Sequence, residues 1–346
     1  MTTETEVPYP HDDPAPVPDA ELFAAPPTTL PGIFFGAAGL RAGWSLLIFI
    51  ALLVALIFAT NAIAHKLLPP PSTPSPDHAI SFRFGFIAEL LPFLAVLLVT
   101  WILSKIEHRP ISVYGLGGVR KLQHFLAGLG WGVTCLSLLV LTLWKTGLLV
   151  IESRRLFGSR VWFFGALWLF GFLLVGLLEE YLTRGYLQYT LTRGLAGFYR
   201  WAFQTRHDAA LGFWTAAVFF SILFGLVHGK NPGESPIGLL SAGCGAMVFC
   251  LSLWRTGSLW WAVGFHTSWD WAQSFLYGVA DSGTMVQHRL LATHPVGKPI
   301  LSGGATGPEG SIFILAILAL MTLIILFTIP RTEGYATKLP RQRLEA

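Results

Sequence analysis

Eight apolar runs, each near the ~20 residues that a bilayer core requires, constrain the fold of this chain more than any other feature. A backbone inside the bilayer must satisfy its own hydrogen bonds, and an α-helix does so within one segment. The sequence therefore predicts an all-α protein, a polytopic transmembrane helix bundle of about eight spans. The expected spans are Trp44–His65, Gly85–Ser104, Leu122–Trp144, Val161–Leu182, Ala209–His228, Ile237–Trp254, Leu259–Val279 and Ser311–Ile329.

The composition supports a membrane protein and excludes other classes. Hydrophobic residues make up 53% of the chain and charged residues only 12%, whereas soluble domains carry about 25% charged residues. The net charge of +4 comes without a dense Lys/Arg stripe, so nucleic acid is not an expected partner. The three cysteines lie in apolar runs without CxxC pairing, which is typical of buried thiols.

The chain divides by composition into a membrane core and polar flanks. The N-terminal residues are rich in Pro, Thr, Asp and Glu, which predicts a disordered tail. The expected units are a tail at 1–30, an interfacial segment with three transmembrane helices at 31–160, a transmembrane core at 161–279, a loop at 280–310, a last transmembrane helix at 311–330 and a C-terminal tail at 331–346.

The loops give an orientation and one candidate gate. Lys and Arg are more numerous on the side of the termini, which favours a multi-pass protein of the cell membrane with both termini cytoplasmic. The loop Asp281–Gly310 carries His288 and His294, and we expect it to be solvated. Its glycines would allow a movement that gates access.

Two adjacent carboxylates close the fourth run, in Leu178–Glu179–Glu180–Tyr181. An ionised group at the centre of a spanning helix costs about 2.5–3.5 kcal/mol on insertion scales, so such groups usually face a partner or a wet cavity. Arg184 is four residues after Glu180 and shares its helix face. Glu179 is rotated away from that pair, as a positioned general base would be. The alternative is a salt bridge at the helix end.

Further polar residues lie in the fifth and seventh runs. His266 and Asp270 stand four residues apart in mid-span and share one helix face. His228 closes the fifth run, where a lone histidine is more often an interfacial residue. Glu89, early in the second span, is expected to be structural because a carboxylate near a helix N-terminus gains from the macrodipole.

These groups together predict a buried polar cavity. If Glu179, His228, His266 and Asp270 were isolated in lipid, they would oppose insertion by about 10 kcal/mol in total. Convergence on one wet pocket between the fourth, fifth and seventh spans removes most of that cost. Small residues on the sixth span would let helices approach closely around the pocket.

Three chemistries suit such a cavity, and the residues alone do not choose between them. A carboxylate can activate water for attack on a peptide bond, with imidazole and a second polar group stabilising the oxyanion. A divalent metal could be held by Glu179, His228 and His266, although no HExxH sequence is present. The same groups could relay protons in a transporter.

The chain resembles the CPBP family, the CAAX prenyl endopeptidases and bacteriocin-processing or self-immunity proteins. Residues 179–184, EEYLTR, match the family's EExxxR pattern, Phe224 to His228 matches FxxxH, and His266 to Asp270 matches HxxxN or HxxxD. The motifs occur in the family's order on separate expected spans. The resemblance covers roughly Val161–Val279 and is similar to bacterial members.

The resemblance implies a glutamate-dependent intramembrane endopeptidase without a cofactor. Glu179 would be the general base, His228 would polarise the attacking water, and His266 with Asp270 would stabilise the oxyanion. Glu180 and Arg184 would support the helix and tune Glu179. The chain departs from the CAAX enzymes at Asp270, where they carry Asn. An ionised carboxylate repels an oxyanion, so Asp270 would be protonated or would orient His266.

The expected partners are the lipid bilayer and a lipidated or membrane-inserted peptide that reaches the site from the bilayer. Two functions from other classes compete with hydrolysis. A non-catalytic immunity or scaffold protein would keep the pocket for structure. A proton-coupled transporter would show symmetric spans broken by Gly or Pro, and no such repeat is evident in the sequence.

Overall fold

The computed structural model describes residues 30–36, 39–67 and 79–330. The expected tail at 331–346 lies outside these residues, as does the tail at 1–30 apart from its last residue. The described chain is a bundle of long helices with two small two-stranded sheets. Among the described residues, six helices are long and apolar enough to cross a membrane, which confirms the predicted helical membrane bundle.

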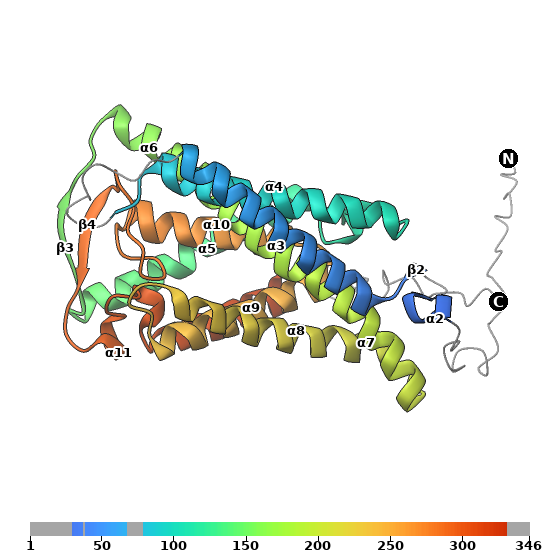
Figure 1. Cartoon of the computed structure of the whole chain (residues 1–346). Helices are drawn as coiled ribbons and strands as arrows, with labels where there is room; N and C mark the ends of the chain where they lie inside the picture. Colours follow the sequence, from blue (N-terminus) through green and yellow to red (C-terminus); the bar gives the residue numbers. More distant parts are fainter. Residues whose placement is uncertain (1–29, 37–38, 68–78, 331–346) are drawn as a thin grey trace, which may run out of the picture.

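In Figure 1, α3 and α4 lie along one side of the bundle and α8 and α9 along the other, with α10 between them. Two later segments are shorter than the six long spans: α10 with the π-helix η4, and α12. The helices are α2 (Leu30–Phe34), α3 (Ala42–Leu67), α4 (Phe82–Ile106), η1 (Ile111–Val113), α5 (Lys121–Lys145), α6 (Ser159–Glu180), η2 (Tyr181–Leu187), α7 (Gln188–Phe203), α8 (Asp208–Val227), η3 (His228–Lys230), α9 (Pro236–Thr256), α10 (Trp260–Trp271), η4 (Ala272–Leu276), α11 (Pro299–Ser302), η5 (Pro308–Gly310) and α12 (Ile314–Thr328).

The fourth span is longer than expected. The sequence predicted its end at Leu182, but α6 continues through the π-helix η2 into α7 without a break, from Ser159 to Phe203. Because α7 contains Arg193 and Arg200 among its apolar residues, it lacks the uniform hydrophobicity of a span. The end of α7 projects from the bundle in Figure 1.

Glycines set the distance between α5 and α10. A Cβ atom at Gly128 or Gly132 would overlap backbone carbonyl oxygens of Trp261 and Phe265 on α10. In return, Gly264 on α10 lies against the carbonyl oxygen of Phe125. The two α5 glycines are four residues apart, the spacing that allows membrane helices to pack at close range. This contact fixes α10, which carries His266 and Asp270.

We expect Gly128→Val to destabilise the bundle. The added side chain must push α10 away, and overpacking of this kind costs about 1–3 kcal/mol. Gly130→Val is the matched control, because a Cβ at Gly130 meets nothing within 4 Å. Thermal unfolding of the purified variants in detergent measures the difference. Equal melting temperatures for the two variants would contradict this account of the α5–α10 contact.

The loop after η4 is folded onto the bundle. Its strand β4 (Leu291–Pro295) pairs antiparallel with β3 (Leu149–Arg154), and this sheet lies at the end of the bundle opposite to α7 in Figure 1. The second sheet joins β1 (Phe35–Gly36) and β2 (Gly39–Leu40). His288 and His294 are exposed, as expected for a solvated loop. Other parts of the loop are buried, which contradicts that expectation.

Candidate active site

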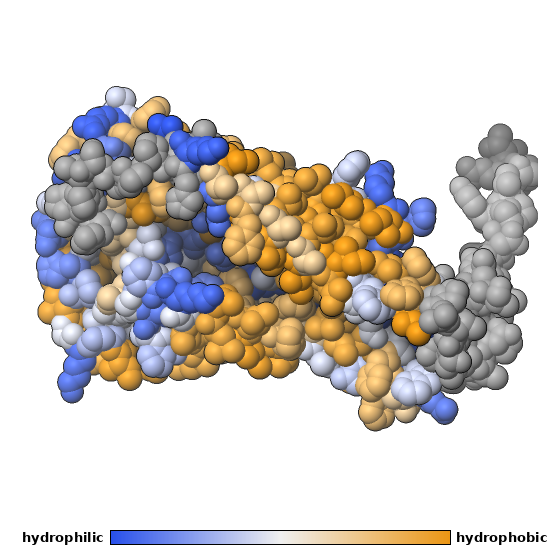
Figure 2. All heavy atoms as spheres, viewed as in Figure 1, coloured by the Kyte–Doolittle hydropathy of each residue, from blue (hydrophilic) through white to orange (hydrophobic). Residues whose placement is uncertain are grey.

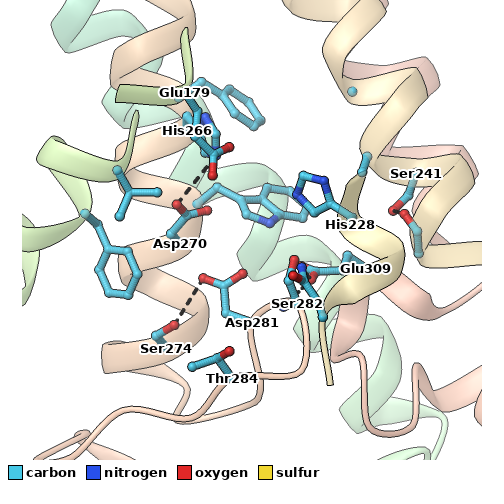
Figure 3. A pocket seen from close by; sticks show the side chains of 18 of the residues that line it. Glu179, His228, Ser241, His266, Asp270, Ser274, Asp281, Ser282, Thr284 and Glu309 are labelled. Carbon is cyan, nitrogen blue, oxygen red and sulfur yellow. Dashed lines mark hydrogen bonds and ion pairs between the residues drawn. The ribbon is translucent and has the colours of Figure 1, made fainter. Parts of the chain in front are cut away.

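A cavity of about 330 Å³ lies inside the bundle, between α4, α6, α8, α9, α10, α12 and the loop after η4. The four residues predicted to converge all line it: Glu179, His228, His266 and Asp270. Figure 3 shows Glu179, His266 and Asp270 together, with the His228 ring on the far side of the cavity from Asp270. Residues from three distant sequence segments therefore share one polar chamber.

The last turn of α6 presents its two glutamates to different surroundings. The Glu180 side chain is fully buried, whereas the Glu179 side chain is 32% exposed and lines the cavity. Oε1 of Glu180 accepts a hydrogen bond from Arg184 Nη1 at 2.6 Å and another from His266 Nδ1 at 3.0 Å. The predicted pair of Glu180 and Arg184 is present, and Glu180 also orients His266, a contact that sequence spacing does not reveal.

Arg184 is held by aromatic rings as well as by Glu180. Its guanidinium carbon lies 4.8 Å from the ring centre of Phe224 and 5.5 Å from that of Phe249. A desolvated cation between aromatic faces gains from their quadrupoles. Arg184 belongs to the π-helix η2, and single π-helical turns are frequent at functional sites. The aromatic of the FxxxH motif thus contacts the arginine of the EExxxR motif.

His266 is surrounded by carboxylates. Nε2 lies 3.7 Å from Glu179 Oε2 and 3.6 Å from Asp270 Oδ2. Since a carboxylate only accepts, Nδ1 of His266 carries the proton in its bond to Glu180. Nε2 therefore faces two carboxyl groups, and three carboxyl groups in all surround the ring.

His228 begins the short 3-10 helix η3 at the end of α8. Nδ1 of its ring lies 2.7 Å from the carbonyl oxygen of Phe224. A carbonyl oxygen only accepts, so Nδ1 donates and Nε2 of the neutral ring is an acceptor. This bond fixes the orientation of the ring against the preceding helical turn. The spacing of four residues also brings the Phe224 ring beside the His228 ring, with 4.6 Å between the ring centres.

Glu89 is placed differently from its prediction. It lies on α4, seven residues after Phe82, beyond the first turn in which a carboxylate gains from the helix dipole. Its side chain lines the same cavity as Glu179. The predicted dipole role is therefore wrong, and Glu89 adds a further acidic group to the chamber.

Two carboxylates that the sequence did not indicate also line the cavity. Asp281 and Glu309 come from the two ends of the loop that we expected to be solvated. Burial raises the pKa of Asp281 well above its usual range, and the charges of Asp270 and Glu309 raise it further. Burial also raises the pKa of Glu309, partly offset by hydrogen bonds from Gln273 and Ser282. The sequence did not indicate them because an acidic residue in a Gly-rich loop, unlike one inside an apolar span, has no cost of membrane insertion and so does not stand out as a candidate site residue.

The cavity lies on the apolar side of the molecule. Figure 2 shows a hollow with hydrophilic surface inside it, bordered by hydrophobic surface towards the middle of the molecule and by hydrophilic surface towards the end that carries β3 and β4. Helices α4 and α8, which supply Phe86 and Phe224 to the lining, also carry exposed apolar side chains such as Phe84 and Leu226. Of the six small residues on the sixth span expected to allow close helix approach, Gly238, Ser241, Ala242, Gly245 and Ala246 line the cavity from α9, whereas Gly243 packs against the backbone of Ser221 on α8.

A metal centre would require Glu179, His228 and His266 to converge on one point. Within the described ranges, no group of three His, Cys, Asp or Glu side chains is arranged to hold a metal ion. His266 instead directs its two nitrogens at carboxylates, at 3.0 to 3.7 Å. These side chains therefore do not form a ready-made set of metal ligands.

One family model matches the chain. Residues 161–272 match the family described as Type II CAAX prenyl endopeptidase Rce1-like. No curated protein and no solved structure gives a match. The matched segment contains Glu179, His228, His266 and Asp270, and it runs from the first turn of α6 to the first residue of η4. This segment, about a third of the chain, is therefore similar to the CAAX-type membrane proteases of the CPBP family.

Proposed function

We propose that this protein is a glutamate-dependent intramembrane endopeptidase that hydrolyses a peptide bond in a lipidated or membrane-embedded substrate. The observation that carries the proposal is the convergence of Glu179, His228, His266 and Asp270 on one cavity. The family match supports peptidase chemistry in general terms. CAAX-type cleavage is the activity that it suggests for this chain.

Glu179 is the proposed general base. It is the partly exposed member of the glutamate pair, so water can reach it. The carboxylate takes a proton from water as the water oxygen attacks the carbonyl carbon, and it delivers the proton to the leaving amine when the C–N bond breaks. The acceptor Nε2 of His228 holds the second hydrogen of that water and fixes its direction. Such proton transfers contribute about 10²- to 10⁴-fold in rate.

His266 and Asp270 are the proposed oxyanion partners. A doubly protonated His266 presents a positive Nε2–H to the oxygen that becomes negative in the tetrahedral intermediate. Asp270 Oδ2, at 3.6 Å from that nitrogen, favours the charged ring. This role differs from that of Asn, which would donate directly, and it accounts for a carboxylate at this position. Glu180 and Arg184 keep the ring in place.

The substrate is proposed to enter from the bilayer. The hollow in Figure 2 has a hydrophilic interior and an apolar border towards the middle of the molecule, which suits a peptide with one lipid-soluble end. The aromatic side chains Phe86, Phe172 and Phe224 line the same cavity as Glu179. An apolar anchor can therefore remain in a hydrophobic environment while the scissile bond reaches the carboxylates.

The function is tested with the purified protein in liposomes, using a peptide that carries a farnesylated cysteine. We expect hydrolysis that continues in the presence of a strong chelator, because the proposed chemistry uses side chains alone. Mass spectrometry of the products measures it. Loss of cleavage on chelation, restored by zinc, would favour a metal-dependent protease. Solute uptake without new peptide termini would favour a transporter.

A further inference from the structure

The floor of the cavity is built by the two ends of the loop after η4. Asp281, Ser282 and Thr284 line the cavity from one end of that loop and Glu309 lines it from the other. We call these four residues the cavity floor. The segment lies outside the matched family residues 161–272, so the family motifs do not include it.

Glu309 joins the cavity floor to the helix that carries Asp270. Its Oε1 accepts hydrogen bonds from the backbone N–H of Ser282 at 2.6 Å and from the Ser282 hydroxyl at 3.0 Å. Its Oε2 accepts from Gln273 Nε2 at 2.6 Å. Gln273 is in η4, three residues after Asp270, and also donates to the carbonyl oxygen of Ala280. One carboxylate thus ties three parts of the chain together.

The same loop contacts the turn that follows His228. The backbone N–H of Gly283 donates to the carbonyl oxygen of Thr306, and the Thr306 hydroxyl donates to the carbonyl oxygen of Gly233 at 3.1 Å. Gly283, at φ +79°, packs so closely on Pro232 that a Cβ atom would overlap its carbonyl oxygen. The loop that carries the cavity floor is therefore packed against residues 231–235 and hydrogen-bonded to them.

The loop glycines serve close packing. A Cβ atom at Gly307, at φ +113°, would overlap the carbonyl oxygen of Ala280, and one at Gly303 would overlap the carbonyl oxygen of Gly307. Only glycine adopts these backbone angles at such short distances without strain. These contacts place the loop between the His228 turn and the end of α10, with close packing on both sides.

We propose that Glu309 is a positioning residue that fixes the His228 turn relative to His266 and Asp270 by holding the cavity floor in place. The expected effect on the cleavage rate rests on the proposed function. The structural link from Glu309 through the cavity floor to the His228 turn can be tested without measuring activity. Charge-assisted hydrogen bonds are about twice as strong as neutral ones, and Glu309 makes three. A shift of 1 Å in such a site can cost about 10²-fold in rate.

The test compares Glu309→Ala with Glu309→Gln and with a matched control, Glu152→Ala. Glu152 is a half-exposed glutamate in β3 that pairs with His294 at the surface. We expect Glu309→Ala to lower kcat for the farnesylated peptide by about 10²-fold, with KM within about threefold. Glu309→Gln keeps an acceptor for Ser282 and should recover at least about tenfold of that loss. Glu152→Ala should resemble the wild type.

Amide hydrogen exchange of the same detergent-purified variants gives the second measurement. Glu309→Ala should speed exchange both in residues 281–284 and in residues 231–235, although Glu309 has no hydrogen bond to the latter. Unchanged exchange at 231–235, or an unchanged kcat, would overturn the proposal. A wild type that cleaves no better than Glu179→Gln would instead refute the proposed function, and the exchange result would still decide the coupling.

Discussion

Glu179→Gln is expected to lower kcat/KM for peptide cleavage by about 10²- to 10⁴-fold, the contribution of a general base. The amide keeps the size and most contacts of the side chain but cannot take a proton from water. Steady-state kinetics on the farnesylated peptide measure the loss. Since Glu179 lines the cavity and is the exposed member of its pair, the fold should be unaffected.

Glu89→Gln is the matched control for this experiment. It removes a second carboxyl group from the same cavity and leaves the side chain of the proposed base in place. We expect it to change kcat/KM far less than Glu179→Gln does. Equal losses for the two variants would mean that the cavity needs its total negative charge, and the assignment of Glu179 as the base would be wrong.

Arg184→Met is expected to give the largest loss of stability. It removes the partner of a fully buried carboxylate, and breaking a buried ion pair from one side costs about 3–5 kcal/mol. Thermal unfolding in detergent measures it. Glu180→Gln combined with Arg184→Met removes both charges and should recover part of the loss, because no unpaired charge remains.

Arg160→Met controls for the general effect of removing an arginine. Arg160 is exposed in the first turn of α6, and its guanidinium carbon lies 5.7 Å from the ring centre of Phe164, a cation–π contact like that of Arg184. We expect the unfolding temperature of Arg160→Met to stay close to that of the wild type. If Arg184→Met were as stable as Arg160→Met, the Glu180–Arg184 pair would not hold the end of α6.

The part of the site that could be predicted from the sequence is the part that carries an energetic penalty in lipid. Glu179, His266 and Asp270 interrupt apolar runs, and their cost in a bilayer marks them. The helical spacing of four residues also predicted the Glu180–Arg184 pair, which is present at 2.6 Å. Periodicity within one helix is visible in a sequence, so these contacts could be anticipated.

Contacts between helices could not be predicted in the same way. The hydrogen bond from His266 to Glu180 joins α10 to α6 across 86 residues, and no local pattern encodes it. Glu309 was missed for another reason. A carboxylate is an ordinary residue in a polar loop, so nothing in the sequence distinguishes it as a site residue. The extension of α6 into α7 was missed because its arginines lower the hydropathy that defines a span.

One comparison tests most directly whether this cavity hydrolyses peptide bonds with Glu179 as the base. Purified wild-type protein and Glu179→Gln are each incubated with a membrane proteome in ¹⁸O-labelled water, and new peptide termini are identified by mass spectrometry. We expect new carboxyl termini that contain ¹⁸O, from membrane-embedded or lipidated proteins, with the wild type only. The same termini with both proteins, or none with either, would contradict it.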